Sequence, residues 1–178
     1  TSFSTTAGGL LRLDSGLFNL NQGESVAVTA GTLEISGATL TTTGASAING
    51  AGTLFLSSGT INGTGTLTVN SGFDWSTGTL SGTGTLLLNG AGRILSGSTK
   101  ALSRTLEIGG QTTATNASGT MQIQQGGVVS VLSSGEFVMD GGASITSTGN
   151  GRIDNAGLMR KTGAAANALA MPLSNSGT

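Results

Sequence analysis

The chain of 178 residues contains no cysteine, no histidine and no tyrosine, and it has a single proline. Without cysteine it can form no disulfide, so the sequence says nothing about redox compartment. Without histidine it lacks the base of Ser-His-Asp and Cys-His catalysis and the usual ligand of zinc and non-haem iron sites. We therefore expect neither a cofactor nor a bound metal, and we expect no enzymatic activity.

Charge is scarce as well: charged residues make up 8% of the chain and the formal net charge is −1. The seven Lys and Arg residues are scattered and form no basic stripe that could neutralise phosphates, which argues against nucleic-acid binding. No apolar stretch approaches the roughly twenty residues that a membrane-spanning helix needs, so we expect no membrane insertion of this segment.

Glycine is abundant, with 32 residues, and a Gly-Thr-Leu-x-Ile phrase recurs along the chain. A flexible Gly/Ser/Thr linker is the alternative, but Leu, Ile, Val and Phe together exceed the level typical of disorder and recur in register. Self-similarity at about twenty residues predicts a solenoid, whose units bury their apolar side by stacking. The copies begin at Gly9, Gly31, Gly52, Gly65, Gly84, Arg104, Gly119, Gly135 and Gly151.

Within each copy the residue types alternate as in a strand with one buried side. Leu33 and Ile35 would share the inner face, while Thr32 and Glu34 would share the outer one. Because the strands are short, bounded by glycine and free of helical periodicity, we predict an all-β fold. It is a single-stranded parallel β-helix (β-solenoid), right-handed, of roughly eight to nine coils. Residues 1–178 form one domain, a segment of a longer array.

Stacking one copy on each coil predicts two internal columns of aliphatic side chains. The first is Leu33, Leu54, Leu67, Leu86, Leu106, Met121, Phe137 and Ile153. The second is Ile35, Leu56, Val69, Leu88, Ile108, Ile123 and Met139. The interval of 13 residues from Gly52 to Gly65 is too short for a three-sided coil, so that coil is flattened or one strand is misplaced.

A second glycine follows each copy, and we expect it to supply the positive φ of a sharp corner. These glycines are Gly16, Gly37, Gly59, Gly72, Gly92, Gly110, Gly127, Gly142 and Gly157. Helical propensity is evident only in the alanine-rich segment 164–170, which precedes Pro172; a loop or strand of the solenoid is equally consistent with it.

The sequence gives only weak support for a chemical site. Glu34 and Glu107 would share one outward column several coils apart, too far to cooperate. Asp140-Gly141-Gly142 lacks the order and repetition of a calcium roll and indicates a turn. The outward threonines would form a ladder without a regular second column beside it, so strand propensity explains them better than ice binding. They are Thr32, Thr53, Thr66, Thr85, Thr105 and Thr120.

One possible glycan contact is the loop Phe73-Asp74-Trp75, which contains the only tryptophan. An exposed Trp75 next to Asp74 could stack on a sugar ring, whereas packing against the core is the alternative that we favour. Asn62-Gly63-Thr64 and Asn116-Ala117-Ser118 match the glycosylation sequon, which arises easily in a Ser/Thr-rich chain.

Three segments carry a family resemblance: 75–86 (WSTGTLSGTGTL), 100–106 (KALSRTL) and 153–163 (IDNAGLMRKTG). They resemble repeats of very large bacterial secreted and surface proteins, including autotransporter-like and haemagglutinin-type adhesins. That resemblance implies a β-helical stalk outside the cell and carries over no catalytic residue. Arg104 stands in place of the repeat's glycine and Asn155 in place of an inward aliphatic residue, so the later coils are expected to deviate.

The leading functional hypothesis is an extracellular structural or adhesive module that forms a stiff stalk or filament at a bacterial cell surface. Neither end shows a charged or helical cap, so we expect further solenoid repeats, or identical subunits, to continue it end to end. A first alternative is a β-helix that binds or cleaves polysaccharide, including cell-surface glycans; a groove gathering several of Asp74, Trp75, Arg93 and Lys100 would favour it. A second is an amyloid-like fibre subunit.

Overall fold

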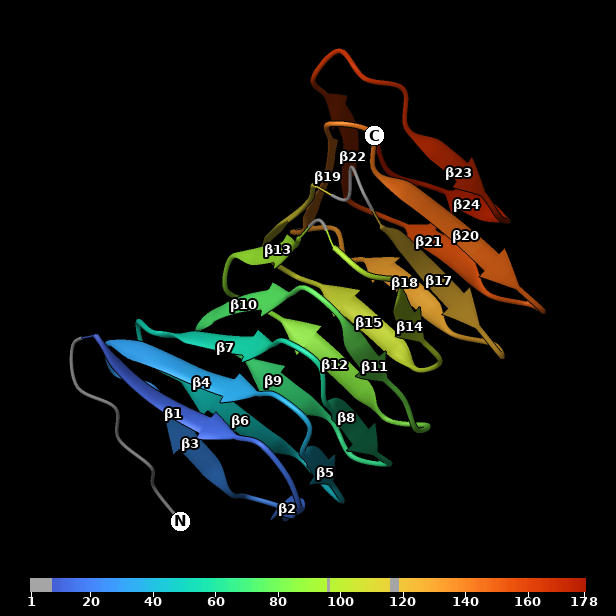
Figure 1. Cartoon of the computed structure of the whole chain (residues 1–178). Coiled ribbons are helices and arrows are strands. Elements are labelled where there is room, and N and C mark those ends of the chain that lie inside the picture. Colours follow the sequence, from blue (N-terminus) through green and yellow to red (C-terminus); the bar gives the residue numbers. More distant parts are fainter. Residues whose placement is uncertain (1–7, 96, 116–118) are drawn as a thin grey trace.

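The structure, a computed structural model, describes residues 8–95, 97–115 and 119–178. It is a β-solenoid of about seven turns, in which short strands wind around three faces (Figure 1). Eight strands, one per rung, stack on each face, so seven turns lead from the first rung to the last. The blue and the red parts of the chain occupy opposite ends of the stack. The all-β solenoid is therefore confirmed, with slightly fewer turns than predicted; its right-handed sense stays a prediction.

Every third strand belongs to the same sheet, and every neighbouring pair is parallel. Sheet 1 contains β1 (Gly9–Leu13), β4 (Gly31–Ile35), β7 (Thr53–Leu56), β10 (Gly72–Trp75), β13 (Gly92–Ile94), β16 (Gln111–Ala114), β19 (Glu136–Asp140) and β22 (Leu158–Thr162).

Sheet 2 contains β2 (Leu17–Leu20), β5 (Thr39–Thr42), β8 (Thr60–Gly63), β11 (Gly78–Leu80), β14 (Lys100–Leu102), β17 (Thr120–Gln124), β20 (Ser144–Thr148) and β23 (Ala168–Ala170). Sheet 3 contains β3 (Ser25–Ala27), β6 (Ser46–Asn49), β9 (Leu67–Val69), β12 (Thr85–Leu88), β15 (Thr105–Ile108), β18 (Val128–Val131), β21 (Arg152–Asn155) and β24 (Leu173–Asn175). Three consecutive strands make one rung, from β1–β2–β3 at the first rung to β22–β23–β24 at the last.

The inward side chains of both predicted columns are buried, but the columns themselves were assigned wrongly. Leu33 and Leu54 stack in sheet 1, whereas Leu67, Leu86 and Leu106 stack in sheet 3. The later members are divided among all three sheets: Met121 is in sheet 2, Phe137 in sheet 1 and Ile153 in sheet 3. The repeat phrase marks a strand that follows a corner, and a rung has three such strands.

This assignment explains the uneven spacing of the copies. The 13 residues from Gly52 to Gly65 lead from β7 to β9, a step of two strands, whereas the 21 from Gly31 to Gly52 lead from β4 to β7, a whole rung. A strand was therefore misplaced in the prediction and the coil is not flattened. Counting each copy as one coil also overstated the number of turns.

Glycine at the corners has two separate roles. Gly37 has φ +132°, in the left-handed region that other residues avoid, as predicted. Gly59 has no positive φ; a Cβ there would lie 2.3 Å from the Ala38 carbonyl oxygen of the preceding rung. Close stacking thus excludes a side chain at such corners, while two of the expected corner glycines, Gly72 and Gly92, begin strands instead.

Candidate functional site

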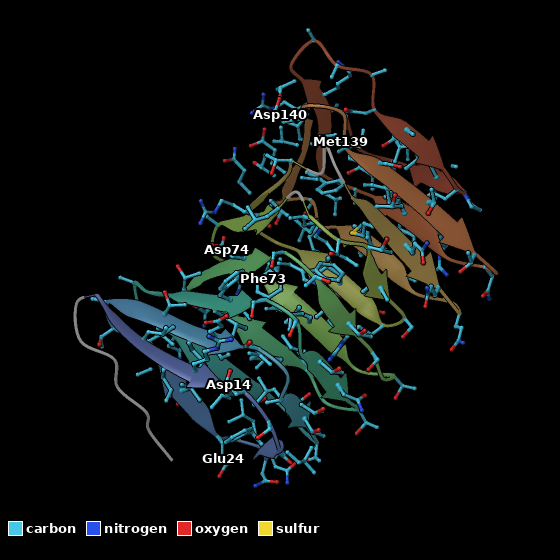
Figure 2. All side chains as sticks on the ribbon, in the orientation of Figure 1. Asp14, Glu24, Phe73, Asp74, Met139 and Asp140 are labelled. Atoms are coloured by element: carbon cyan, nitrogen blue, oxygen red, sulfur yellow. The ribbon has the colours of Figure 1, made fainter. Side chains whose placement is uncertain are left out.

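The predicted glycan contact lies on strand β10, not in a loop. Trp75 is completely buried and stacks in the inward row between Leu56 and Ile94. The favoured interpretation, packing of Trp75 against the core, is therefore confirmed, and this ring is not exposed for stacking on a sugar. Because strand residues alternate between faces, Asp74 points outward while Phe73 points into the core (Figure 2).

Asp74 forms an ion pair with Arg93 on the next rung of sheet 1. The Arg93 Nε atom donates to Asp74 Oδ1 at 2.7 Å, and Nη2 donates to Oδ2. This hydrogen-bonded carboxylate raises the pKa of Arg93. Of the four residues named for a polysaccharide groove, Asp74 and Arg93 come together on the outer surface, whereas Trp75 and Lys100 are buried.

The other predicted surface ladders are also divided among the faces. Glu34 lies on sheet 1 and Glu107 on sheet 3, so they share no column. Thr32 pairs with Thr53 on sheet 1 and Thr85 with Thr105 on sheet 3, while Thr120 lies on sheet 2. The sequon at 116–118 lies outside the described residues. Segment 164–170 contains strand β23 and no helix.

Arg104 is a buried cation that the sequence signalled only as a break in the repeat. It directly precedes Thr105, whose register partner Thr85 follows Gly84, so it occupies a glycine position in the stack. Its Nε atom donates to the Gly84 carbonyl at 3.3 Å and its Nη2 atom to the Gly65 carbonyl at 3.2 Å. Burial lowers the pKa of Arg104 to about 10. The guanidinium therefore lies over the backbone of the two preceding rungs, where Gly84 and Gly65 have no side chain to exclude it.

Lys100 is a second buried cation and occupies an inward position of β14, in register between Gly78 and Met121. Its ammonium donates to the Ser98 carbonyl at 3.1 Å, and burial lowers its pKa. Since the neighbouring rung has methionine in this row, we predict that Lys100→Met raises the free energy of unfolding by about 1–3 kcal/mol at pH 7. The melting temperature would rise by about 2–4 °C per kcal/mol.

The same prediction has a pH signature. The folded-state pKa of Lys100 lies below that of the unfolded chain, so the unfolded chain binds more protons between the two values. Stability of the wild type therefore rises with pH in that window, and the advantage of Lys100→Met should shrink as pH increases from 7 to 10.5. Thermal melts of both proteins across this range provide the measurement; a constant difference would contradict the burial of the charge.

The two ends of the solenoid are the remaining candidate surface. At the first rung a cavity of about 260 Å³ opens among Leu11, Leu13, Phe18, Leu20 and Val26. At the last rung Leu158, Leu169 and Leu173 are exposed. The outer strands of all three sheets there, β1–β3 and β22–β24, have a neighbouring strand on one side only. Thr178 returns over β22, where its carbonyl accepts from the Met159 N–H at 2.7 Å. The sequence predicted uncapped ends but did not identify the side chains that line them.

The residues that the structure describes hold no group of three or more Asp, Glu, His or Cys side chains arranged for a metal ion. They also contain no helix with the length and apolarity to span a membrane.

Comparison of the chain with protein-family models, with curated proteins and with solved structures found no match. The assignment as a β-solenoid therefore rests on the chain's own strand order and register. It identifies the fold and leaves the function to be proposed.

Proposed function

We propose that this chain is a structural module: one stretch of a stiff β-solenoid stalk on the outside of a bacterial cell. The observation that carries the proposal is the unbroken strand order, in which each sheet runs through all eight rungs without a skipped or reversed strand. Every rung is hydrogen-bonded to the next on three faces, so bending the rod requires lengthening bonds on at least one face.

The outer surface supports the same role. Ion pairs tie neighbouring rungs on sheet 1, as between Asp74 and Arg93 and between Glu136 and Arg160. Asparagines stack in a ladder where sheet 3 turns toward sheet 1: Asn89 Nδ2 donates to Asn70 Oδ1 at 3.0 Å, and Asn70 Nδ2 to Asn49 Oδ1 at 2.7 Å. These contacts join successive rungs, as a stiff stalk requires.

The test uses length as its measurement. One, two and three copies of the chain in tandem are placed between a surface anchor and a labelled tip domain on a bacterial cell. With rungs about 4.8 Å apart, each added copy of eight rungs should move the tip outward by about 38 Å. Atomic force or electron microscopy of the cell surface reads the height, and a tandem Gly/Ser linker of equal residue number is the control.

A tip height that does not grow linearly with copy number would overturn the spacer role. Binding of the isolated chain to a neutral or acidic polysaccharide, with the height unchanged, would instead favour the carbohydrate alternative.

A further inference from the structure

One of the three faces of the rod carries no charge. The outer surface of sheet 2 runs along the stack from β2 to β23 (Figure 1). In the described strands of this sheet the single charged residue is Lys100, which points inward and is buried. Outward ion pairs lie on the other two faces, Asp74–Arg93 on sheet 1 and Arg152–Asp154 on sheet 3. Strand propensity explains threonine on every face, but it does not explain why one face lacks charge.

Hydroxyl and amide groups line this face in two rows, because residues two apart on a strand point to the same side. In the rungs of β5, β8 and β11 every outward position carries such a group. The first row is Thr39, Thr60 and Thr79, and the second is Thr41, Asn62 and Ser81. We call these six residues the hydroxyl face. The sequence did not show them as a set, because its repeat phrase marks threonines that lie on three different sheets.

The threonine hydroxyls of this face are available to a ligand and are held in place. Among the described residues, no protein group bonds to the side-chain hydroxyls of Thr39, Thr41, Thr60 and Thr79. Their β-branched side chains are stiff. The backbone beneath them is fixed by hydrogen bonds between rungs, such as the one from the Thr60 N–H to the Ala38 carbonyl at 2.9 Å. The face is therefore a rigid array that loses little conformational entropy when it binds.

The corners beside the hydroxyl face are short and contain only Gly, Ala, Ser and Thr. They are residues 36–38 and 57–59 before β5 and β8, and residues 43–45 and 64–66 after these strands. A planar surface can therefore approach the face without meeting a long side chain at either edge.

The spacing of the hydroxyl face identifies the ligand. Residues two apart on a strand are separated by about 6.6 Å, and successive rungs by about 4.8 Å. The prism face of hexagonal ice is a planar surface that repeats in two directions at intervals close to these. Threonine hydroxyls donate to and accept from lattice water, whereas a charged group would retain its own hydration shell. We propose that sheet 2 binds ice through the hydroxyl face. The proposal goes beyond the stalk function and does not depend on it.

Two other occupants fit the face less well. Polysaccharide recognition by stacking needs an outward aromatic ring, and the described strands of sheet 2 have none, because Phe18 lies in the inward row of Leu40. A second copy of the chain would need apolar side chains at the centre of the contact. The rungs of β5, β8 and β11 expose no large apolar side chain.

The test is partition into ice. Ice is grown slowly from a dilute solution of the fluorescently labelled chain with albumin as reference, and both proteins are measured in the ice and in the remaining liquid. Thr60→Lys places a charge at the centre of the hydroxyl face. Thr68→Lys places the same charge on an outward position of β9, on sheet 3 of the same rung, and is the matched control. Circular dichroism confirms the fold of both variants.

The wild type and Thr68→Lys should concentrate in the ice while albumin stays in the liquid. Thr60→Lys should lower the fraction in ice about tenfold, because a lysine ammonium cannot give up its hydration to the lattice. Exclusion of the wild type from ice, to the same extent as albumin, would overturn the proposal. Equal partition of the two variants would show that the hydroxyl face is not the binding surface. The tandem-copy height measurement decides the stalk role separately.

A second pair of variants guards against a folding defect at position 60. Thr79→Lys lies on the hydroxyl face one rung further along, and Thr85→Lys lies outward on β12 of the same rung. The first should again leave the ice and the second should remain in it.

Two further measurements identify the rival occupants. Sedimentation with insoluble cellulose that is lost in Thr60→Lys, without partition of the wild type into ice, would replace ice by a neutral polysaccharide. A wild-type dimer in light scattering that becomes monomeric in Thr60→Lys would show that a second copy covers the face. Either result would overturn the ice proposal.

Discussion

Replacing Trp75 by alanine is expected to lower the free energy of unfolding by about 3–5 kcal/mol. The indole is completely buried in sheet 1, and removing it leaves a cavity between Leu56 and Ile94 that their inter-rung hydrogen bonds prevent from collapsing. Chemical denaturation followed by far-ultraviolet circular dichroism measures the change, because the variant lacks the only tryptophan.

Two controls separate packing from surface chemistry. Trp75→Phe keeps an aromatic ring in the row and should cost less than half as much as alanine. Asp74→Ala removes the neighbouring outward ion pair and should cost at most about 1 kcal/mol, as exposed pairs do. If Trp75→Ala unfolded at the wild-type denaturant concentration, the tryptophan would not be in the core, and a sugar-stacking role would be open again.

Replacing Gly84 by alanine should be nearly as damaging, at about 3 kcal/mol or more, for a different reason. A Cβ atom at Gly84 would lie 2.0 Å from the Gly65 carbonyl oxygen, which belongs to the backbone of the preceding rung. That oxygen also accepts from the Arg104 guanidinium at 3.2 Å, so moving it disturbs a third rung. The rungs would have to separate at this corner, weakening hydrogen bonds on both sides of it.

Gly72→Ala is the matched control, because the nearest atom to a Cβ there is the Thr53 hydroxyl oxygen at 3.1 Å, and the nearest backbone atom, the Gly52 carbonyl oxygen, lies at an ordinary contact distance of 3.4 Å. We expect its melting temperature to lie within a few degrees of the wild type, and that of Gly84→Ala to fall by at least about 6 °C. Equal melting temperatures for the two variants would show that close stacking of the corners does not limit the residue at position 84.

Local pattern was a good guide to what faces inward. The alternation in Gly31-Thr32-Leu33-Glu34-Ile35 predicted a strand with Leu33 and Ile35 buried, and both are buried. The same reasoning assigned Asn155 to an inward position, where its side chain bonds Asn175 at 2.6 Å. Period-two alternation is a property of one strand, so it can be read without knowing which strands are neighbours.

The candidate sites were harder to predict because they depend on neighbours far apart in the chain. Asp74 and Arg93 are 19 residues apart and form a pair only because β10 and β13 are adjacent. Arg104 stands at a position where other copies of the repeat have glycine, which the sequence shows. Its burial, however, depends on the carbonyl groups of Gly65 and Gly84 in two other rungs.

By itself, the sequence determined that this chain is an all-β solenoid with an aliphatic interior, because repeated alternation and corner glycines act within a few residues. Only the tertiary structure decided which face each strand occupies, since one phrase serves all three faces and the number of strands between copies varies. It also decided that Trp75 lies inside and that Asp74 lies outside, paired with Arg93. Those properties arise from stacking, which brings together residues about twenty positions apart.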